Sequence, residues 1–207
     1  MLHCSVTGPS PMPLSDPFER NLLHLRDIQL RGYQRKDGLF DIEAHLVDTK
    51  SYGFNNEGRS WIEAGEALHG MWIRMTITED FEVLSCEAAS DFTPYDVCPA
   101  AAPNFARLAG LKIGPGFVRA VNERVGGIHG CTHLREVIGQ MGTVAFQTLY
   151  PLRRQREREQ AEARRAAGEV VDEKKVRPAL IGTCIAYAPD SPVVKQRWPL
   201  YEPEKAE

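Results

Sequence analysis

The sequence predicts an α+β domain, in which an antiparallel sheet of about four or more strands, built by the N-terminal two-thirds, packs against C-terminal helices. Two observations lead to this fold class. Up to about residue 89, apolar and polar side chains alternate, which is the period of a half-buried strand. Beyond residue 100, apolar side chains recur at the spacing of a helix, about 3.6 residues. Strands followed by helices is the order typical of α+β domains.

The alternating runs predict two consecutive hairpins, which pair residues 23–34 with 39–48 and residues 68–78 with 81–89. On the third of these strands, His69 shares a face with apolar side chains, whereas Trp72 and Arg74 point to the other face. The polar stretch 50–66 between the hairpins is expected to be a long loop or a short helix.

Helices are predicted at residues 105–109, 117–125 and 132–149. The last of these carries a continuous apolar stripe from Leu134 to Ala145. Pro151 is expected to interrupt or kink it, because proline cannot donate a helical hydrogen bond.

These elements divide the chain into four parts. We expect a loose N-terminal arm, a single α+β domain, a charged helix or arm, and a C-terminal strand that returns to the core and ends in a tail. Their ranges are 1–17, 18–150, 151–178 and 179–207.

Composition excludes several classes of function. The 207 residues carry a formal net charge of −3, so the chain has no overall attraction to nucleic acid, and no uncharged run is long enough to cross a membrane. The N-terminus lacks the pattern of an export signal, which predicts a cytoplasmic protein with free cysteines. The sequence contains no phosphate loop and no dinucleotide fingerprint, and we therefore expect no nucleotide cofactor.

One candidate site lies in the glycine-rich segment 126–134, where Cys131 and His133 meet the start of the longest predicted helix. A helix start offers free N–H groups, and its partial positive charge predicts a lowered pKa for His133, which would then act as a base. The alternative is structural: Cys131 and the residue after it cap the helix, and the glycines allow tight packing.

A second candidate site surrounds His69, which the strand pattern places on the apolar face. A buried histidine needs a hydrogen-bond partner, which Glu66 or a carboxylate from the neighbouring hairpin can supply. Beside Glu66, His69 is predicted to stay protonated and act as an acid. Here the alternative is an ordinary core histidine with its hydrogen bonds satisfied. A third candidate, the turn that carries Tyr95 and Cys98, fits a pocket rim or a plain connection.

Four stretches of the chain resemble the family called domain of unknown function 2889. The resemblance covers about residues 20–150 and is most specific at Gly130–Leu134; the stretches are 42–50, 65–74, 94–98 and 130–147. The family implies no established activity, and it implies an association with the bacterial breakdown of aromatic compounds.

We therefore expect a small enzyme without a cofactor, a lyase that releases a small aldehyde from a phenolic compound by retro-aldol cleavage, with a phenol or ketone of the substrate as the electron sink. Its small aromatic substrate is its expected partner, with no nucleic acid and no membrane, and a homodimer is left open. The expected catalytic residues are His69, His133, Glu66, Glu136 and Cys131, and the expected substrate-binding residues are Lys50, Arg59, Arg74, Trp72, Tyr95 and Gln147.

Two alternatives from other classes stay open. One is a zinc- or iron-dependent enzyme or metal-binding protein, since histidine and cysteine are ligands that both metals accept; the candidates are His69, Cys98, His129, Cys131 and His133. The other is a non-catalytic module that binds a ligand or a partner, with residues 153–177 as its docking arm.

Overall fold

The computed structural model describes residues 14–168, 180–199 and 201. The chain divides between Leu149 and Tyr150 into two compact units. Within the described residues, no helix is both long enough and apolar enough to span a membrane.

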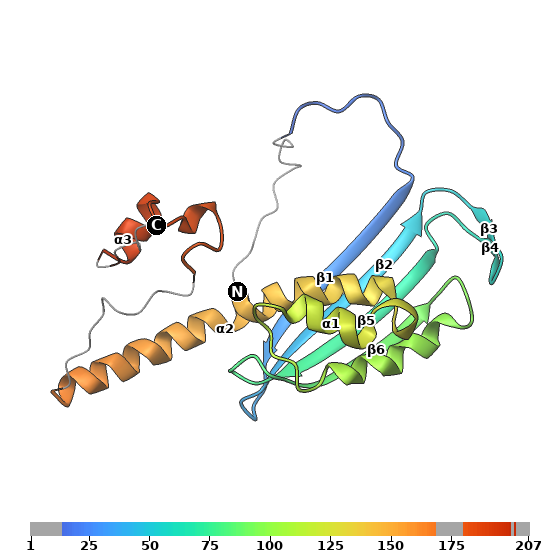
Figure 1. Ribbon diagram of the computed structural model, residues 1–207. Coiled ribbons are helices and arrows are strands. Elements are labelled where there is room, and N and C mark those ends of the chain that lie inside the picture. The colour runs from blue at the N-terminus through green and yellow to red at the C-terminus, as the bar shows by residue number, and fades with distance from the viewer. Residues whose placement is uncertain (1–13, 169–179, 200, 202–207) are drawn as a thin grey trace, which may run out of the picture. The chain divides into compact units, whose positions relative to one another are not determined.

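The first unit is built on a four-stranded antiparallel sheet, which confirms the predicted fold class (Figure 1). The strands follow the spatial order β1-β2-β5-β6, so both predicted hairpins form and β2 and β5 lie in the middle. Their bounds are β1 His24–Gln34, β2 Phe40–Lys50, β5 Ala67–Ile77 and β6 Val83–Phe92.

The stretch between β2 and β5 is neither a simple loop nor a helix, and this prediction is wrong. It forms a small hairpin of β3 (Phe54–Asn56) and β4 (Ser60–Ile62). The Asn56 side chain accepts hydrogen bonds from the backbone N–H groups of the third and second residues after it, at 2.9 and 3.1 Å. This side chain supplies the turn, in the way that asparagine commonly does.

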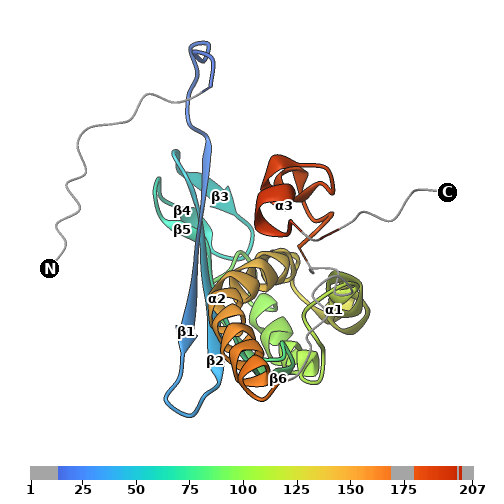
Figure 2. The ribbon, with the colours of Figure 1, turned by 90° about the vertical axis from the view of Figure 1, so that its left-hand side faces the viewer.

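Helices cover one face of the sheet and leave the other open (Figure 2). The alternation of β2 places Ile42, Ala44 and Leu46 in the core, where the stripe of the long helix is also buried. The predicted helix at 105–109 is the end of a longer 3-10 helix. The helical bounds are Cys98–Leu108 for that 3-10 helix, α1 Phe117–Val125, a second 3-10 helix Gly127–His129, and α2 Thr132–Ala166.

Helix α2 continues through Pro151, so of the two predicted effects, an interruption or a kink, the interruption is wrong. A proline at this position removes the hydrogen bond to the carbonyl of Gln147. Because Gln147 is exposed, water can satisfy that carbonyl.

The charged part of α2 forms an exposed helix as far as Ala166, while residues 169–178 of the predicted arm lie outside the described residues.

The second unit contains a 3-10 helix, Ile185–Tyr187, and the short helix α3, Pro192–Arg197. The Ser191 hydroxyl caps α3 by accepting the N–H of Val194 at 3.2 Å. Over 180–187 the described residues form turns and a 3-10 helix, so the predicted return strand is wrong there. Most of the predicted N-terminal arm, residues 1–13, lies outside the described part of the chain.

A single glycine allows α2 to approach the edge of the sheet. A Cβ atom on Gly32 would overlap the hydroxyl of Thr148 and come within 3.0 Å of the Thr148 Cβ atom. The close approach therefore depends on the missing side chain.

We expect Gly32→Ala to destabilise the protein. Alanine gains at most about 1 kcal/mol from the less flexible unfolded chain, whereas overpacking costs about 1–3 kcal/mol. The melting temperature should fall by several degrees in a calorimetric scan, since each 1 kcal/mol shifts it by about 2–4 °C at this chain length. Gly114→Ala is the matched control, because its Cβ would meet nothing within 4 Å. Equal melting temperatures for the two variants would contradict the close approach.

Candidate functional site

A buried carboxylate forms the centre of the site. Asp48, at the end of β2, is 1% exposed. It pairs in register with Arg26 on β1 and with His69 on β5, so the three side chains form one row across three strands. Residues directly opposite each other in an antiparallel sheet share a face. This is the face that the helices cover, because Asp48 continues the buried alternate positions of β2.

Arg26 binds both oxygens of Asp48. Its Nε atom donates to Oδ1 at 2.8 Å and its Nη2 atom donates to Oδ2 at 2.9 Å. Burial would raise the pKa of Asp48, but the hydrogen-bonded guanidinium and its charge outweigh burial and hold this pKa below its ordinary value. Asp48 is therefore an anion whose charge is balanced by Arg26. The Nε2 atom of His24, on the same strand, lies 3.4 Å from Oδ1.

Two histidines meet above this carboxylate. The Nδ1 atom of His69 lies 3.0 Å from Asp48 Oδ2, and the Nε2 atom of His133 lies 3.7 Å from the same oxygen. The ring centroids of His69 and His133 are 3.9 Å apart. His133 comes from the first turn of α2, so the sheet and the helix build the pair together. Because the Nδ1 atom of His69 faces Asp48, its Nε2 atom is the nitrogen left for chemistry.

Both imidazoles have a pKa below the ordinary histidine value. Burial is the main cause for His69, followed by the nearby His133, and Asp48 opposes them only in part. For His133, burial is again the main cause and the Arg26 charge is the next. The predicted lowering for His133 is present, with burial and Arg26 as its causes. The prediction of a protonated His69 is wrong, because burial outweighs its carboxylate.

A pocket of about 500 Å³ opens beside the two histidines. Cys131 lines it, and the Sγ atom of this residue lies 3.7 Å from His133 Nδ1. Among the predicted site residues, the pocket brings together His69, His133, Cys131 and Tyr95. Glu136 reaches the site indirectly, since it accepts a hydrogen bond from Arg26 Nη1 at 3.2 Å. The rest of the wall is largely apolar and includes Met71, Val97, Ala100, Ala101 and Ile128.

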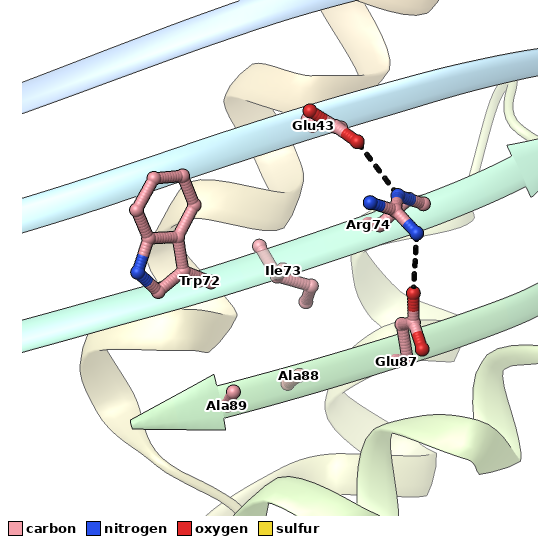
Figure 3. Close-up of a pocket in the computed structure, with 7 residues that line it drawn as sticks. All are labelled: Glu43, Trp72, Ile73, Arg74, Glu87, Ala88 and Ala89. Atoms are coloured by element: carbon pink, nitrogen blue, oxygen red, sulfur yellow. Dashed lines mark hydrogen bonds and ion pairs between the residues drawn. The ribbon is translucent and has the colours of Figure 1, made fainter. Parts of the chain in front are cut away.

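Trp72 and Arg74 lie on the opposite, open face of the sheet and do not belong to this pocket. Figure 3 shows Arg74 on β5 between two carboxylates, Glu43 at 2.6 Å and Glu87 at 2.8 Å, in a separate hollow. The Trp72 ring stacks on His45 with centroids 3.6 Å apart. Their assignment to the substrate pocket is therefore corrected, since alternate residues of a strand point to opposite faces.

Glu66 and Arg59 bind each other and brace the β3–β4 hairpin, and neither contacts His69 in a described interaction. Arg59 Nη1 also donates to the carbonyl of Ala67 at 2.7 Å. Lys50 lies over the rings of Tyr52 and Phe54. The exposed Gln147 lies about four helical turns beyond His133. None of the four predicted residues lines the pocket, so their assignment to it is also corrected.

Sequence reasoning did not identify Asp48, Arg26 or His24. A carboxylate from the neighbouring hairpin was one of the two expected partners of His69, and Asp48 on β2 is this carboxylate. A signal was present, because Asp48 continues the inward-facing series Ile42, Ala44 and Leu46 along β2. A charged residue at an inward position of a strand needs a partner.

Comparison with known proteins gives one family. The model of the family described as "Protein of unknown function (DUF2889)" matches residues 24–147, and the chain belongs to this family. The matched region begins at β1 and includes the whole Asp48 cluster. No curated protein and no solved structure matches the chain.

We expect His133→Asn to raise the pKa of His69, because it removes the second largest cause of the lowering. The midpoint of the His69 ring signal in an NMR pH titration should move toward the ordinary value of about 6.5. His129→Asn is the control, since His129 is exposed and no described interaction joins it to His69. An unchanged midpoint in His133→Asn would show that the two rings are not coupled.

Proposed function

We propose that this protein is a cytoplasmic lyase that cleaves a carbon–carbon bond in a phenolic intermediate of aromatic catabolism and releases a small aldehyde. The observation that carries the proposal is the Asp48–His69 pair at the wall of the pocket, with His133 against it. A carboxylate bound to one imidazole nitrogen orients the other nitrogen for proton transfer. A volume of about 500 Å³ is in the range of small-molecule sites.

The neutral state of the histidines determines what they can do. A neutral His69 accepts a proton at Nε2, and Asp48 then stabilises the imidazolium through Nδ1. His133 lies so close that a second positive charge is disfavoured, and the two neutral rings therefore take up one additional proton at a time. Such a centre can remove a proton from one substrate atom and return it to another.

Retro-aldol cleavage of a β-hydroxy aryl ketone uses this cycle. His69 Nε2 removes the proton of the β-hydroxyl group, the C–O bond becomes the carbonyl of the aldehyde, and the Cα–Cβ bond breaks. The electron pair of that bond enters the aryl ketone and forms an enolate. The histidine pair returns the proton to Cα. Substrate becomes ketone plus aldehyde, and neither water nor an oxidant is consumed.

The pocket wall offers suitable groups for such a substrate. Met71, Val97 and Ile128 supply an apolar surface for an aromatic ring, and Tyr95 lies at the same pocket. The first turn of α2 forms part of the wall, and its leading N–H groups have no partner inside the helix. These dipoles favour negative charge, which develops on the enolate oxygen. Lys50, Arg59 and Arg74 are not needed for this role.

We expect His69→Asn and His133→Asn each to lower kcat/KM by about 10²–10⁴-fold, the range typical of a general acid or base. The double variant should cost little more than either single variant, because the residues act as a unit. The measurement is release of formaldehyde from a 3-hydroxy-1-(4-hydroxyphenyl)propan-1-one by the full chain.

Arg74→Gln is the matched control for this assay. It removes a charge from the same strand but on the open face, and we expect activity within about twofold of the unaltered chain. A panel of β-hydroxy aryl ketones from which no aldehyde is released would refute the lyase, and full activity in His69→Asn would refute the role of the pair.

A second candidate function is a metal-dependent enzyme. Asp48, His69 and His133 offer one oxygen and two nitrogens that all lie within 4.8 Å of one another. One carboxylate and two imidazoles is a donor set that suits iron or zinc. An ion would be held through Asp48 Oδ2, and it would supply Lewis-acid chemistry at the pocket. The Arg26 guanidinium favours the metal-free reading, because it binds both oxygens and repels a cation.

Metal analysis separates the two candidates. If the histidines act without a metal, purified protein should hold well under 0.1 equivalent of iron or zinc, and aldehyde release should persist in EDTA. The metal candidate requires about one equivalent, retained by Arg74→Gln and lost in both His69→Asn and His133→Asn. That result would replace the metal-free reading.

A further inference from the structure

The strand β1 is an open edge of the sheet. It has β2 on one side and no described strand on the other, and Figure 2 shows it at the margin of the sheet. Its 11 residues pair with β2 without a bulge, and they include no proline and no lysine. Leu25 and Tyr33 are 52% and 43% exposed. Proteins usually protect long edges of this kind, because their unpaired N–H and C=O groups can bind another strand.

The phase of the hydrogen bonds shows which groups face outward. Arg35 donates its N–H to the carbonyl of Leu39 at 2.8 Å, and these residues continue the register of β1 with β2. Hydrogen-bonded pairs alternate along an antiparallel ladder, so the odd-numbered residues of β1 bond to β2. The even-numbered residues from His24 to Gln34 therefore direct their N–H and C=O groups toward the open edge.

We propose that β1 pairs with β1 of a second copy of this chain, in antiparallel orientation about a two-fold axis at Gln29. In this register, two residues lie opposite each other when their numbers add up to 58. The first residue of the strand, His24, therefore lies opposite the last, Gln34, and the whole strand is paired. The central pairs are Gln29 with Gln29, Ile28 with Leu30, Asp27 with Arg31, and Leu25 with Tyr33.

The side chains of β1 are complementary to themselves in this register. Asp27 of each copy lies opposite Arg31 of the other, which makes two ion pairs. Leu25 meets Tyr33 on the same face, and the half-buried Ile28 and Leu30 meet on the helical face. Opposite charges and apolar pairs directly across an antiparallel sheet are stabilising. The register also allows the backbone hydrogen bonds between the copies. The even-numbered residues, whose N–H and C=O groups face the open edge, lie opposite even-numbered residues of the second copy.

Neighbouring registers lack this complementarity. An axis at Asp27 or Arg31 would place two like charges opposite each other. An axis at residue 28 or 30 would place Asp27 opposite glutamine or tyrosine, with no ion pair. An axis between two residues would place even-numbered residues opposite odd-numbered ones. The N–H and C=O groups of the odd-numbered residues bond to β2, so the hydrogen bonds between the two copies could not form. The fully overlapping register is thus also the one that matches the charges.

The pairing is compatible with the site around Asp48. Arg26 lies on β1, and in this register it faces Gly32 of the second copy. Glycine brings no side chain, so the guanidinium that binds Asp48 meets no competing group across the axis. The active centre is complete within one copy, and the inference stands independently of the proposed reaction.

Charge exchange tests the register. Light scattering of the full chain during gel filtration should give twice the chain mass of 23.2 kDa. Asp27→Arg and Arg31→Asp should each weaken the dimer at least tenfold, because each replaces two attractions by two repulsions. The double variant Asp27→Arg/Arg31→Asp should restore the dimer, since it rebuilds both ion pairs with the charges exchanged. Arg20→Asp is the matched control, an exposed charge reversal just before β1.

A disulfide provides a second readout. Gln29→Cys places two thiols on the axis in a non-hydrogen-bonded pair, where Cα atoms are about 4.5 Å apart, within the range of a disulfide. In a background without the exposed Cys184, mild oxidation should link Gln29→Cys into a covalent dimer and leave Asp27→Cys unlinked. A monomeric chain at micromolar concentration, or a dimer that neither single charge reversal weakens, would overturn the proposal.

Discussion

The structure of the site depends on a carboxylate that has almost no contact with water. Burying an unpaired charge costs several kcal/mol, so Asp48 can occupy its inward position only if partners replace the lost hydration. Arg26 and His69 supply them from the two adjacent strands, at the positions that the register places opposite Asp48. The buried carboxylate therefore links three strands at this end of the sheet, and His133 on the first turn of α2 reaches the same carboxylate, 3.7 Å from Oδ2.

The same charge balance sets the chemistry of the histidines. An isolated carboxylate would favour protonated imidazoles, but Arg26 already offsets the charge of Asp48, and burial disfavours a further cation. The result is a pair of neutral rings in van der Waals contact, where one proton can enter and a second is opposed. Reversible proton transfer between substrate atoms needs this property, and it does not require the two histidines to have widely separated pKa values.

The sequence predicted the elements well where a single period dominates. Alternation on β2 and β5 and the stripe of α2 each reflect burial of one face, which acts on every residue of the element. The site was harder, because it depends on register. The sequence left two partners for His69, the nearby Glu66 or an unspecified carboxylate from the neighbouring hairpin, because Asp48 is 21 positions away and becomes a neighbour only when the strands pair. Trp72 shows the converse: it is near His69 in sequence and on the other face in space.

The position of Arg26 links the site to the edge of the sheet. A central strand is held by two neighbours, but β1 has one within the described chain, and edge strands open more readily than central ones. The residue that balances the buried charge thus lies on an edge strand. Fraying of β1 would withdraw the guanidinium and leave Asp48 beside two histidines, which would raise their affinity for a proton. Anything that holds β1 in place, including a second copy of the strand, therefore keeps the histidine pair neutral and able to act as a base.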